Sequence, residues 1–456
     1  TAKRKENTMG KNKIPETGIY DARQLGTGRM LLLGFQHMFA MFGATVLVPA
    51  LTGLSVSATL LFAGLGTLFF HFVTKGKVPA FLGSSFAYLA GYAAIAPNGE
   101  AALLPYACVG VAASGLLYLI LAALVRGFGA NRVMRFFPPV VTGPIIICIG
   151  MTLANSAINN CTGSWDIALV AILTVVIFNI WGKGMLRIIP ILLGVLVSYV
   201  YAAVTGRVDF SGVASAAWIG LPVKMENTVF SLIGNCDANL LVTAIIAIMP
   251  IAFATMIEHI GDICAISSTV GANFIADPGL HRTLLGDGLA TSIASLFGAP
   301  ANTTYGENTG VLALTRVYDP LVIRLAAVYA IIASFCPKFA ALVSAMPTGT
   351  IGGVSLILYG MISAIGVRNL VENRVDLAKS RNVIVVSLII SLALGITFSA
   401  AGAITFHVGE FTLNFSGLAV AAIVGIVVNA ILPGKDYNFQ NDYEYGKTTE
   451  DHGQML

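Results

Sequence analysis

Long apolar runs separated by short polar breaks account for most of this chain of 456 residues. A transmembrane helix needs about 20 mostly apolar residues. Runs such as 101–125 are apolar on every face, whereas the strands of a transmembrane β-barrel alternate apolar and polar residues. The pattern therefore predicts an all-α polytopic membrane protein. Its fourteen predicted spans are 30–51, 57–74, 79–95, 101–125, 138–157, 165–181, 186–204, 238–259, 282–299, 302–315, 319–336, 349–366, 383–400 and 412–432.

Two of these spans, 79–95 and 302–315, are short and interrupted by small polar residues. Residues 83–85 are Gly-Ser-Ser, and residues 302–304 are Asn-Thr-Thr. The two spans take third place in each run of seven. Interrupted segments at corresponding positions in two halves indicate a transporter built from inverted repeats, with its substrate near mid-membrane. We therefore expect two inverted repeats of seven spans.

Composition narrows the function further. Hydrophobic residues make up 56% of the chain and charged residues only 11%, against roughly 25% charged in soluble proteins. The net charge of +4 is spread over loops, which argues against a nucleic-acid partner. The six cysteines have no CxxC or metal-ligand spacing and are expected to be apolar filler. No nucleophile–base pair, metal cluster or phosphate loop is evident, so we expect no enzyme, metal or cofactor.

Lysine and arginine in short loops set the predicted orientation. The first 29 residues are polar and basic, so no cleavable signal peptide is expected. Loops after even-numbered spans carry most of the remaining basic residues, whereas loops after odd-numbered spans mostly lack them. Both termini are therefore predicted to be cytoplasmic. The loop residues behind this prediction are Lys75, Lys77, Arg126, Arg132, Arg135, Lys183, Arg187, Arg316, Arg368, Arg374, Lys379 and Arg381.

Four carboxylates lie in or beside predicted spans: Glu258, Asp262, Asp287 and Glu307. Ionisable side chains within a bilayer are costly and are functional candidates by default. Glu258 and Asp262 are four residues apart and share one helical face. Because two such close acids repel, the pair is expected to hold a proton, as proton coupling requires. The alternative is that span 8 ends earlier and leaves both acids solvated at its mouth.

The interrupted segments predict a binding site for a flat heterocycle. The stretch 302–310 has hydroxyls, Asn and Gly around Glu307, and the stretch 82–87 contains Ser85 and Phe86. Each is expected to be extended chain running into a half-helix with free backbone N–H groups. Carboxylate acceptors, backbone donors and an aromatic ring together suit a pyrimidine base.

Three weaker candidates complete the set. His37 in span 1 is either a hydrogen-bonding group of the cavity or an interhelical contact. Asp287, between two glycines, is expected to form a functional pair. Tyr359, Gly352 and Gly353 are expected to serve packing rather than contact with substrate.

These residues resemble the nucleobase–ascorbate transporter family. The resemblance rests on residues 36–45 (QHMFAMFGAT), 83–86 (GSSF), 258–261 (EHIG) and above all 302–316 (NTTYGENTGVLALTR). It extends from about residue 24 to residue 433 and is strongest to the family's bacterial uracil carriers. The last motif is highly specific, and Glu307, Asn308, Gly310, Thr315 and Arg316 fill it here.

The resemblance implies an architecture in which a core domain moves against a gate domain, often within a homodimer in the bacterial inner membrane. It also implies short paired strands within spans 3 and 10. The implied division is a cytoplasmic N-terminal tail at 1–29, core parts at 30–137 and 238–337, gate parts at 138–237 and 338–433, and a cytoplasmic C-terminal tail at 434–456.

The resemblance also assigns roles. Glu258 and Glu307 would bond the base, Phe86 would pack on its ring, and Ser85, Tyr305 and Gly306 would line the site. Asp262, Glu258, Asp287 and His37 would serve proton coupling. Glutamate where Glu307 stands is typical of uracil carriers, whereas purine carriers tend to have glutamine. One departure concerns Asp262, because the best-known uracil carrier has histidine there, whereas many relatives, purine carriers included, have aspartate.

The resulting hypothesis is a uracil:proton symporter that is driven by the proton gradient and works by alternating access. A purine carrier for xanthine or urate, with the same machinery, is the first alternative. An anion carrier on the same scaffold is the second, but it would want a fixed cation beside the broken helices, and no Lys or Arg lies in the predicted cavity.

Overall fold

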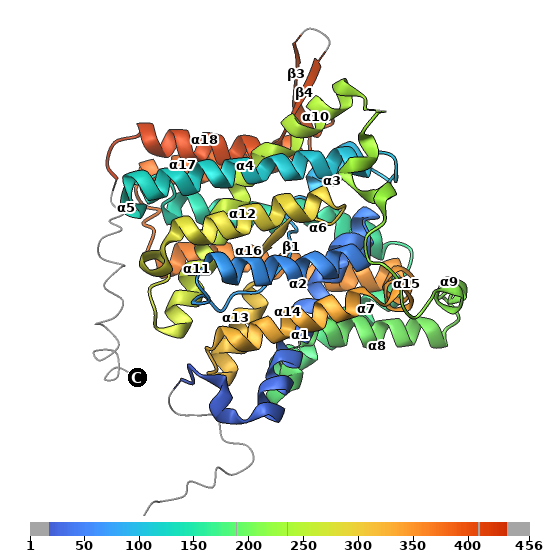
Figure 1. Ribbon diagram of the computed structural model, residues 1–456. Helices are drawn as coiled ribbons and strands as arrows, with labels where there is room; N and C mark the ends of the chain where they lie inside the picture. Colours follow the sequence, from blue (N-terminus) through green and yellow to red (C-terminus); the bar gives the residue numbers. More distant parts are fainter. Residues whose placement is uncertain (1–17, 188, 235, 409–410, 436–456) are drawn as a thin grey trace, which may run out of the picture.

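The computed structural model describes residues 18–187, 189–234, 236–408 and 411–435, and it is mostly helical (Figure 1). Most of the two predicted tails, 1–29 and 434–456, lies outside these ranges. Within them, seven helices are long and apolar enough to cross a membrane, or eight if a pair bent by 88° is one span. The chain is thus a multi-pass helical protein, and the count of fourteen spans and the inverted repeat stay predictions.

The helices of the first half are α1 (Thr27–Thr52), α2 (Val56–Val73), α3 (Leu89–Ile95), α4 (Leu104–Phe128), α5 (Ala130–Met134), α6 (Pro139–Cys161), α7 (Trp165–Trp181), α8 (Pro190–Val204) and α9 (Ser211–Ser215). Those of the second half are α10 (Ala238–Ile248), α11 (Ala252–Val270), α12 (Leu280–Leu296), α13 (Gly306–Thr315), α14 (Pro320–Ser334), α15 (Pro337–Ser344), α16 (Thr348–Glu372), α17 (Ser380–Thr397) and α18 (Gly417–Ile431). The strands are β1 (Leu82–Ser84), β2 (Asn302–Thr304), β3 (Ala403–Val408) and β4 (Phe411–Ser416).

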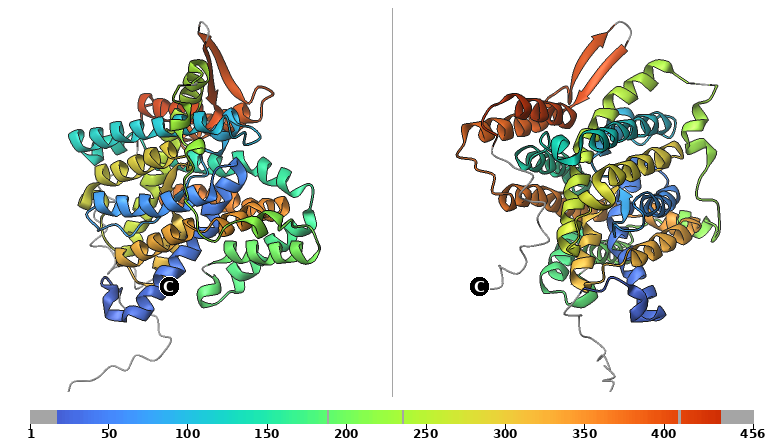
Figure 2. Two further views of the ribbon diagram at one scale, coloured as in Figure 1. Left: turned by 45° about the vertical axis from the view of Figure 1, so that its right-hand side comes forward. Right: turned by 60° about the vertical axis from the view of Figure 1, so that its left-hand side comes forward.

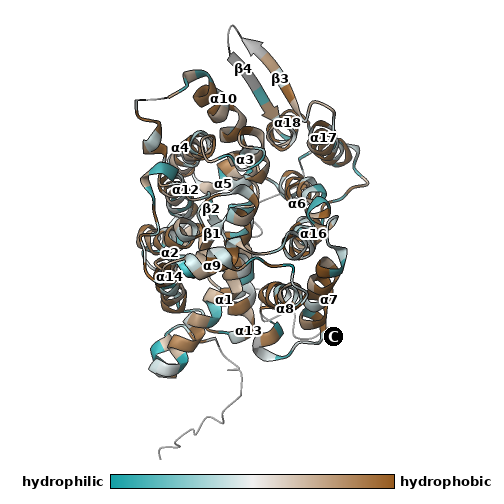
Figure 3. Cartoon of the chain, turned by 90° about the vertical axis from the view of Figure 1, so that its right-hand side faces the viewer, coloured by the Kyte–Doolittle hydropathy of each residue, from teal (hydrophilic) through white to brown (hydrophobic). Residues whose placement is uncertain are grey.

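The long helices form two groups, which Figure 3 shows nearly end-on. We call the first the strand-bearing group because its helices contact β1 and β2. In it, α12 packs against α4 and α2, and α14 packs against α2 and α1. In the second group, α16 packs against α6, α7 and α8, and α17 packs against α18 and α6. The strands β1 and β2 lie between the two groups (Figure 3).

Both interrupted spans contain a short strand followed by a helix, as the resemblance implies. β1 pairs antiparallel with β2, with Leu82 opposite Thr304 and Ser84 opposite Asn302. Two further backbone bonds extend the ladder, from Tyr305 N–H to the Phe81 carbonyl and from Ser85 N–H to the Ala301 carbonyl. Since backbone within a bilayer has no water to bond, this pairing is what permits non-helical chain at that depth.

Span 8 is longer than predicted. The helix breaks at Pro250, because proline lacks the N–H of the helical ladder, and then continues as α11 to Val270. Glu258 and Asp262 therefore lie inside a helix, and the alternative in which both acids sit beyond its end is wrong. The end was misplaced because acids look like a boundary in an apolar run.

Span 14 is shorter than predicted and is preceded by a second pair of strands. Residues 411–416 form β4, which pairs with β3 in a hairpin that projects from the bundle (Figures 1 and 2). The helix α18 begins only at Gly417, after Ser416 caps it by accepting from Ala419 N–H. A short apolar run does not by itself distinguish strand from helix, which is why the hairpin was missed.

Most basic loops gather at one end of the bundle, which we call the near end because it carries both ends of the described chain (Figure 1). Arg282 bonds the Val73 carbonyl, Lys77 pairs with Asp277, and Arg381 bonds the Asn429 carbonyl there. The opposite end is the far end. It holds the exposed ion pair of Arg207 and Asp166.

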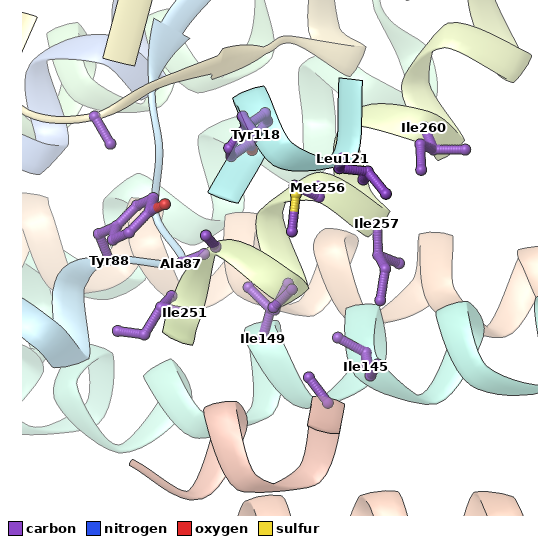
Figure 4. Close-up of a cluster of buried hydrophobic side chains, with 14 of the residues drawn as sticks. Ala87, Tyr88, Tyr118, Leu121, Ile145, Ile149, Ile251, Met256, Ile257 and Ile260 are labelled. Atoms are coloured by element: carbon purple, nitrogen blue, oxygen red, sulfur yellow. The ribbon is translucent and has the colours of Figure 1, made fainter. Parts of the chain in front are cut away.

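Apolar side chains fill the contact between the two groups. Ile145 and Ile149 of α6 belong to the same buried cluster as Ile257 and Ile260 of α11 (Figure 4). These side chains are branched aliphatics, and no hydrogen bond needs to break if one face moves over the other. Burial of this cluster is the main stabilising term at the contact.

Within each group, by contrast, helices touch backbone to backbone at glycines. A Cβ at Gly115 of α4 would lie 2.6 Å from the Gly288 carbonyl of α12, and one at Gly150 of α6 would lie 2.2 Å from the Tyr359 carbonyl of α16. Similar contacts occur at Gly64, Gly110, Gly353 and Gly366. Close backbone packing of this kind is a common way for helices to associate in a membrane.

We predict that Gly150→Ala destabilises the protein by about 1–3 kcal/mol, because the carbonyl it would strike cannot rotate away. Gly395→Ala is the matched control, since nothing lies within 4 Å of the Cβ that it would add to α17. Thermal unfolding in detergent should give a lower midpoint for Gly150→Ala and an equal or higher one for Gly395→Ala. Equal midpoints for Gly150→Ala and the parent protein would contradict the packing described.

Candidate functional site

The paired strands place one aromatic hydroxyl between them. Tyr305, the residue before α13, donates its hydroxyl to the Ser84 carbonyl at 2.8 Å. Gly83 makes room for that ring, because a Cβ there would lie 2.4 Å from it. The Ser84 hydroxyl in turn donates to the Thr45 carbonyl of α1 at 2.8 Å. The strand pair is therefore fixed to α1 as well as to itself.

α13 begins directly after β2, and its first turn holds a carboxylate. Gly306 is exposed, with nothing within 4 Å of a Cβ built on it, and Glu307 beside it is half-buried. The first backbone N–H groups of a helix have no partner inside the helix, so this turn offers donors and an acceptor together. The next residue, Asn308, is buried and bonds His37 of α1 twice, at the Nδ1 atom (3.2 Å) and the carbonyl (3.1 Å).

α11 presents Glu258 and Asp262 toward the same place. Both are half-buried, and the Thr304 hydroxyl donates to Asp262 Oδ2 at 2.8 Å. Glu258 Oε2 is buried without a hydrogen-bond partner in the described part of the chain. The helix α11 that carries Glu258 packs against both β2 and the helix α13 that carries Glu307. The strand β2 thus lies beside both acid-bearing helices.

Asp287 of α12 is fully buried behind this pair of helices. Its Oδ2 atom lies 3.4 Å from Nδ1 of His259, which is also fully buried. The Thr304 hydroxyl lies 3.5 Å from the same nitrogen. Thr304 therefore links Asp262 to the His259–Asp287 pair. An uncompensated charge would be costly at this depth, so a proton held within the pair is physically favoured.

Phe86 lies at the contact between the two groups. Its ring meets Tyr359 of α16 edge to face, with centroids 5.8 Å apart. The hydroxyls of Ser85 and Tyr359 are buried, and neither has a hydrogen-bond partner among the described residues. Such polar atoms are normally satisfied, and an unsatisfied group is a candidate for ligand contact.

Three helices around this site each have a glycine that borders open space. Gly261 of α11, Gly310 of α13 and Gly360 of α16 all have open space where a Cβ would be, and Cys264 is exposed. On the far side of Phe86 the groups are closed around a cavity of about 20 Å³, which has room for about one water. Ala87, Ile149, Ile251 and Thr397 are among the residues lining that cavity.

The structure brings together the residues that sequence singled out. Glu258, Asp262 and Glu307 gather around β2, with Tyr305 and Gly306 at its end, and Ser85 and Phe86 follow the paired β1. His37 bonds Asn308 beside Glu307, and Asp287 lies beside His259. The sequence reasoning gave no role to Thr304, Asn308 or His259, which link these acids to neighbouring helices. All three lie within the sequence motifs that carry the family resemblance, so those motifs could have drawn attention to them.

Comparison with known proteins fits this geometry. The sequence model of the Permease family, which describes xanthine and uracil permeases, matches residues 28–402. The chain belongs to the nucleobase–ascorbate transporter family. This family member is therefore a membrane transport protein and not an enzyme.

Relatives of known name cover almost the whole family member. The uracil permease of Bacillus caldolyticus is 42% identical over 428 residues, which are 91% of this chain and 95% of that protein. The uracil permease of Bacillus subtilis is 40% identical over 91% of this chain and 94% of its own length. The uracil permease of Escherichia coli K12 is 37% identical over 88% and 90%, respectively.

Solved structures agree on the fold. The transmembrane domain of the cyanobacterial bicarbonate transporter BicA matches with a TM-score of 0.61 at 13% identity, over 92% of this chain and all of that one. The murine anion transporter Slc26a9, in its inward-facing state, gives a TM-score of 0.60 at 12% identity, over 92% and 69%. At such low identity the likeness concerns the fold alone.

We predict that Tyr305→Phe destabilises the protein by about 0.5–1.5 kcal/mol, because it removes a buried hydrogen bond to Ser84 and keeps the ring. Tyr20→Phe is the matched control, since its hydroxyl donates to the Val270 carbonyl at the same distance of 2.8 Å from a largely exposed side chain. Thermal unfolding should show a larger loss for Tyr305→Phe. If Tyr305→Phe lowered the unfolding midpoint no more than Tyr20→Phe does, the hydrogen bond from Tyr305 to Ser84 would not stabilise the site as described.

Proposed function

We propose that the protein imports uracil together with a proton by alternating access. The observation that carries the proposal is the strand pair, which brings half-buried Glu258 and Glu307 beside the first turn of α13, where Gly306 borders open space. The relatives named uracil permease supply the substrate. The proposal joins these two independent lines.

Uracil has ring N–H groups that alternate with carbonyl oxygens. Glu258 and Glu307 would accept from the N–H groups, and backbone N–H groups at Phe86 and Gly306 would donate to the carbonyls. The Phe86 ring would pack on the flat face of the base, while Ser85 and Tyr305 would line the site. Charge-assisted bonds to carboxylates are the stronger class of hydrogen bond, so the acids are expected to dominate affinity.

The proton is expected on the acid cluster. Asp262 accepts a bond from Thr304, which connects it to the buried His259–Asp287 pair. Protonation at Asp262 would change the charge that β2 and α13 feel without changing the fold. His37 supports α13 through Asn308 and is proposed to adjust the position of Glu307.

Alternating access would move the strand-bearing group against the second group. We equate them with the core domain (30–137 and 238–337) and the gate domain (138–237 and 338–433). The glycine contacts make each group rigid, whereas the contact between them consists of apolar side chains. Residence in the bacterial inner membrane and a homodimer belong to the same proposal.

A purine carrier is the second candidate. The fold supports it equally, and aspartate at position 262 is shared with purine carriers. Competition of labelled uracil uptake by xanthine separates the two, because a bicyclic base needs more room. An anion substrate is disfavoured, because the ionisable groups around β2 are Glu258, Asp262, Glu307 and histidines.

We predict that Glu307→Gln weakens uracil binding by about tenfold or more, because it replaces a charged acceptor with a neutral amide. Glu372→Gln is the control, since Glu372 is exposed and pairs only with Arg368 four residues earlier in the described structure. Binding of labelled uracil to purified protein, with the amount in the membrane measured in parallel, checks this. Unchanged affinity in Glu307→Gln would remove Glu307 from the site.

We predict that Asp262→Asn lowers proton-driven accumulation of uracil much more than uracil binding. Asparagine still accepts the bond from Thr304 but does not take up or release a proton. Uptake into proteoliposomes with and without an inward proton gradient, beside equilibrium binding, measures both effects. Asp277→Asn at the exposed near-end loop is the control. A full gradient effect in Asp262→Asn would exclude Asp262 from coupling.

A further inference from the structure

The segment from α8 to α10 crosses from one helix group to the other along the far end. We call residues 216–234 the strap. In Figure 1 it passes along the far ends of α14, α2, α12 and α4 in turn before α10 begins. It is one of the covalent links between the second group and the strand-bearing group on this side; α15 between α14 and α16 is another.

Backbone bonds hold the beginning of the strap against the bend between α14 and α15. Gly220 N–H donates to the Phe335 carbonyl at 3.0 Å, and Lys338 N–H donates to the Ala217 carbonyl at 2.9 Å. The Lys338 ammonium lies 5.1 Å from the centre of the Trp218 ring. The strap is therefore fixed in place where it carries its tryptophan.

Further contacts fix the rest of the strap to the strand-bearing group. Val223 packs against an apolar cluster that includes Phe62 of α2. The ring of Phe230 meets that of Phe297 edge to face at 5.5 Å. Just beyond the strap, Asp237 N–H donates to the Tyr106 hydroxyl of α4 at 2.9 Å. These anchors hold the strap in one position along its length.

Despite these anchors, large apolar side chains of the strap point outward. Their exposed fractions are 72% for Trp218, 84% for Ile219, 82% for Leu221, 71% for Met225 and 80% for Ile233. A cluster of this kind on an ordered segment marks a surface that contacts a partner or a membrane. The anchored backbone keeps these side chains from turning inward.

The strap continues the lipid-facing side of α14. Val328, Ile332 and Phe335 lie at spacings of four and three residues and are all exposed, so they form one apolar face of that helix. This face ends at Phe335, whose carbonyl accepts the bond from Gly220. The part of the strap that carries Trp218, Ile219 and Leu221 is therefore bonded to the chain where the apolar face of α14 ends.

Charged side chains alternate with the apolar ones in the strap. Lys224 and Glu226, which are largely exposed, flank Met225, and Lys338 covers one side of the Trp218 ring. Tryptophan beside charged groups is typical of the boundary between the hydrocarbon and the head groups of a bilayer. This composition does not suit a loop that lies wholly in water, where an exposed tryptophan is unfavourable. It does not suit a transmembrane span either, because a span would bury these charges in hydrocarbon.

We propose that the strap is an interfacial membrane anchor, in which Trp218, Ile219 and Leu221 insert into the lipid leaflet at the far end. The partner is the phospholipid surface itself, at the depth where head groups meet acyl chains. Because the strap joins the two helix groups, this anchor fixes the height of the strand-bearing group in the bilayer. The proposal depends only on residence in a membrane and not on the substrate.

Tryptophan fluorescence in the full-length protein tests the anchor, because the chain has only three tryptophans, Trp165, Trp181 and Trp218. A W165F/W181F protein leaves Trp218 as the sole fluorophore. In proteoliposomes made with phosphatidylcholine brominated near the head group or deep in the acyl chain, we expect strong quenching by the shallow label and at least twofold weaker quenching by the deep one. Acrylamide in the water phase should quench weakly.

A second variant shows whether the strap inserts its side chains into the lipid or only lies close to the lipid surface. I219S/L221S in the same background should reduce quenching by the shallow label at least twofold and increase quenching by acrylamide. Its midpoint of thermal unfolding in detergent should stay the same, because both side chains point away from the protein. W165F/W218F, which keeps Trp181 at the last residue of α7, serves as the reference for a tryptophan at the end of a predicted span.

Two outcomes overturn the proposal. One is a Trp218 emission that acrylamide quenches fully and brominated lipid does not, which would place the strap in water. The other is protection of Trp218 that disappears when the protein-to-lipid ratio is lowered, which would assign the surface to a second copy of the chain. Uracil uptake plays no part in either readout, so failure here leaves the proposed function untouched.

Discussion

The antiparallel pairing of β1 with β2 is the constraint on which the rest of the structure depends. Non-helical backbone within a membrane must find partners inside the protein. Residues 82–84 find them in residues 302–304, more than two hundred positions later in the chain, and the Phe81 and Ala301 carbonyls extend the ladder on either side. Helix α13 begins at Gly306, directly after the pairing that has brought the chain there in extended form. The acids of α11 and α13 meet at β2 for the same reason.

This arrangement is costly, and the cost indicates function. Four carboxylates lie in or behind the site, and among the described ion pairs only Asp287 has a basic partner, the histidine His259. A protein that needed only stability would place apolar residues there, since burying charge without a fixed counter-ion opposes folding. Buried polar groups that are kept at such expense are expected at sites of binding and proton exchange. The strand pair and the acids therefore belong to one site, in which the strands position the acids.

Sequence predicted the local features of this site better than its connections. The interruptions at 83–85 and 302–304 were predictable because glycine, serine, asparagine and threonine compete with helical backbone bonding. Partners such as Thr304 for Asp262, or Asn308 for His37, depend on tertiary contacts that no local pattern contains. The end of span 8 was misplaced because an acid in the middle of a helix and an acid beyond its end look alike in sequence. The β3–β4 hairpin was missed although Thr412, Asn414 and Ser416 alternate with apolar residues, a strand pattern that was absorbed into the apolar run that follows it.

The two kinds of helix contact explain how such a site could open to either side without unfolding. At Gly115 and Gly150, backbone meets backbone, and a shift of even one ångström would create a clash or a gap. Across the contact between the groups, Ile145 and Ile257 are aliphatic, so each could pack against a different apolar neighbour and still bury nearly the same area. A helix group that moves as a rigid body needs strong contacts within itself. It also needs an apolar outer face that packs equally well in two positions against the other group. The strand pair belongs wholly to one group, so its acids would travel with that group, and Phe86 would exchange its contact with Tyr359 as the groups move.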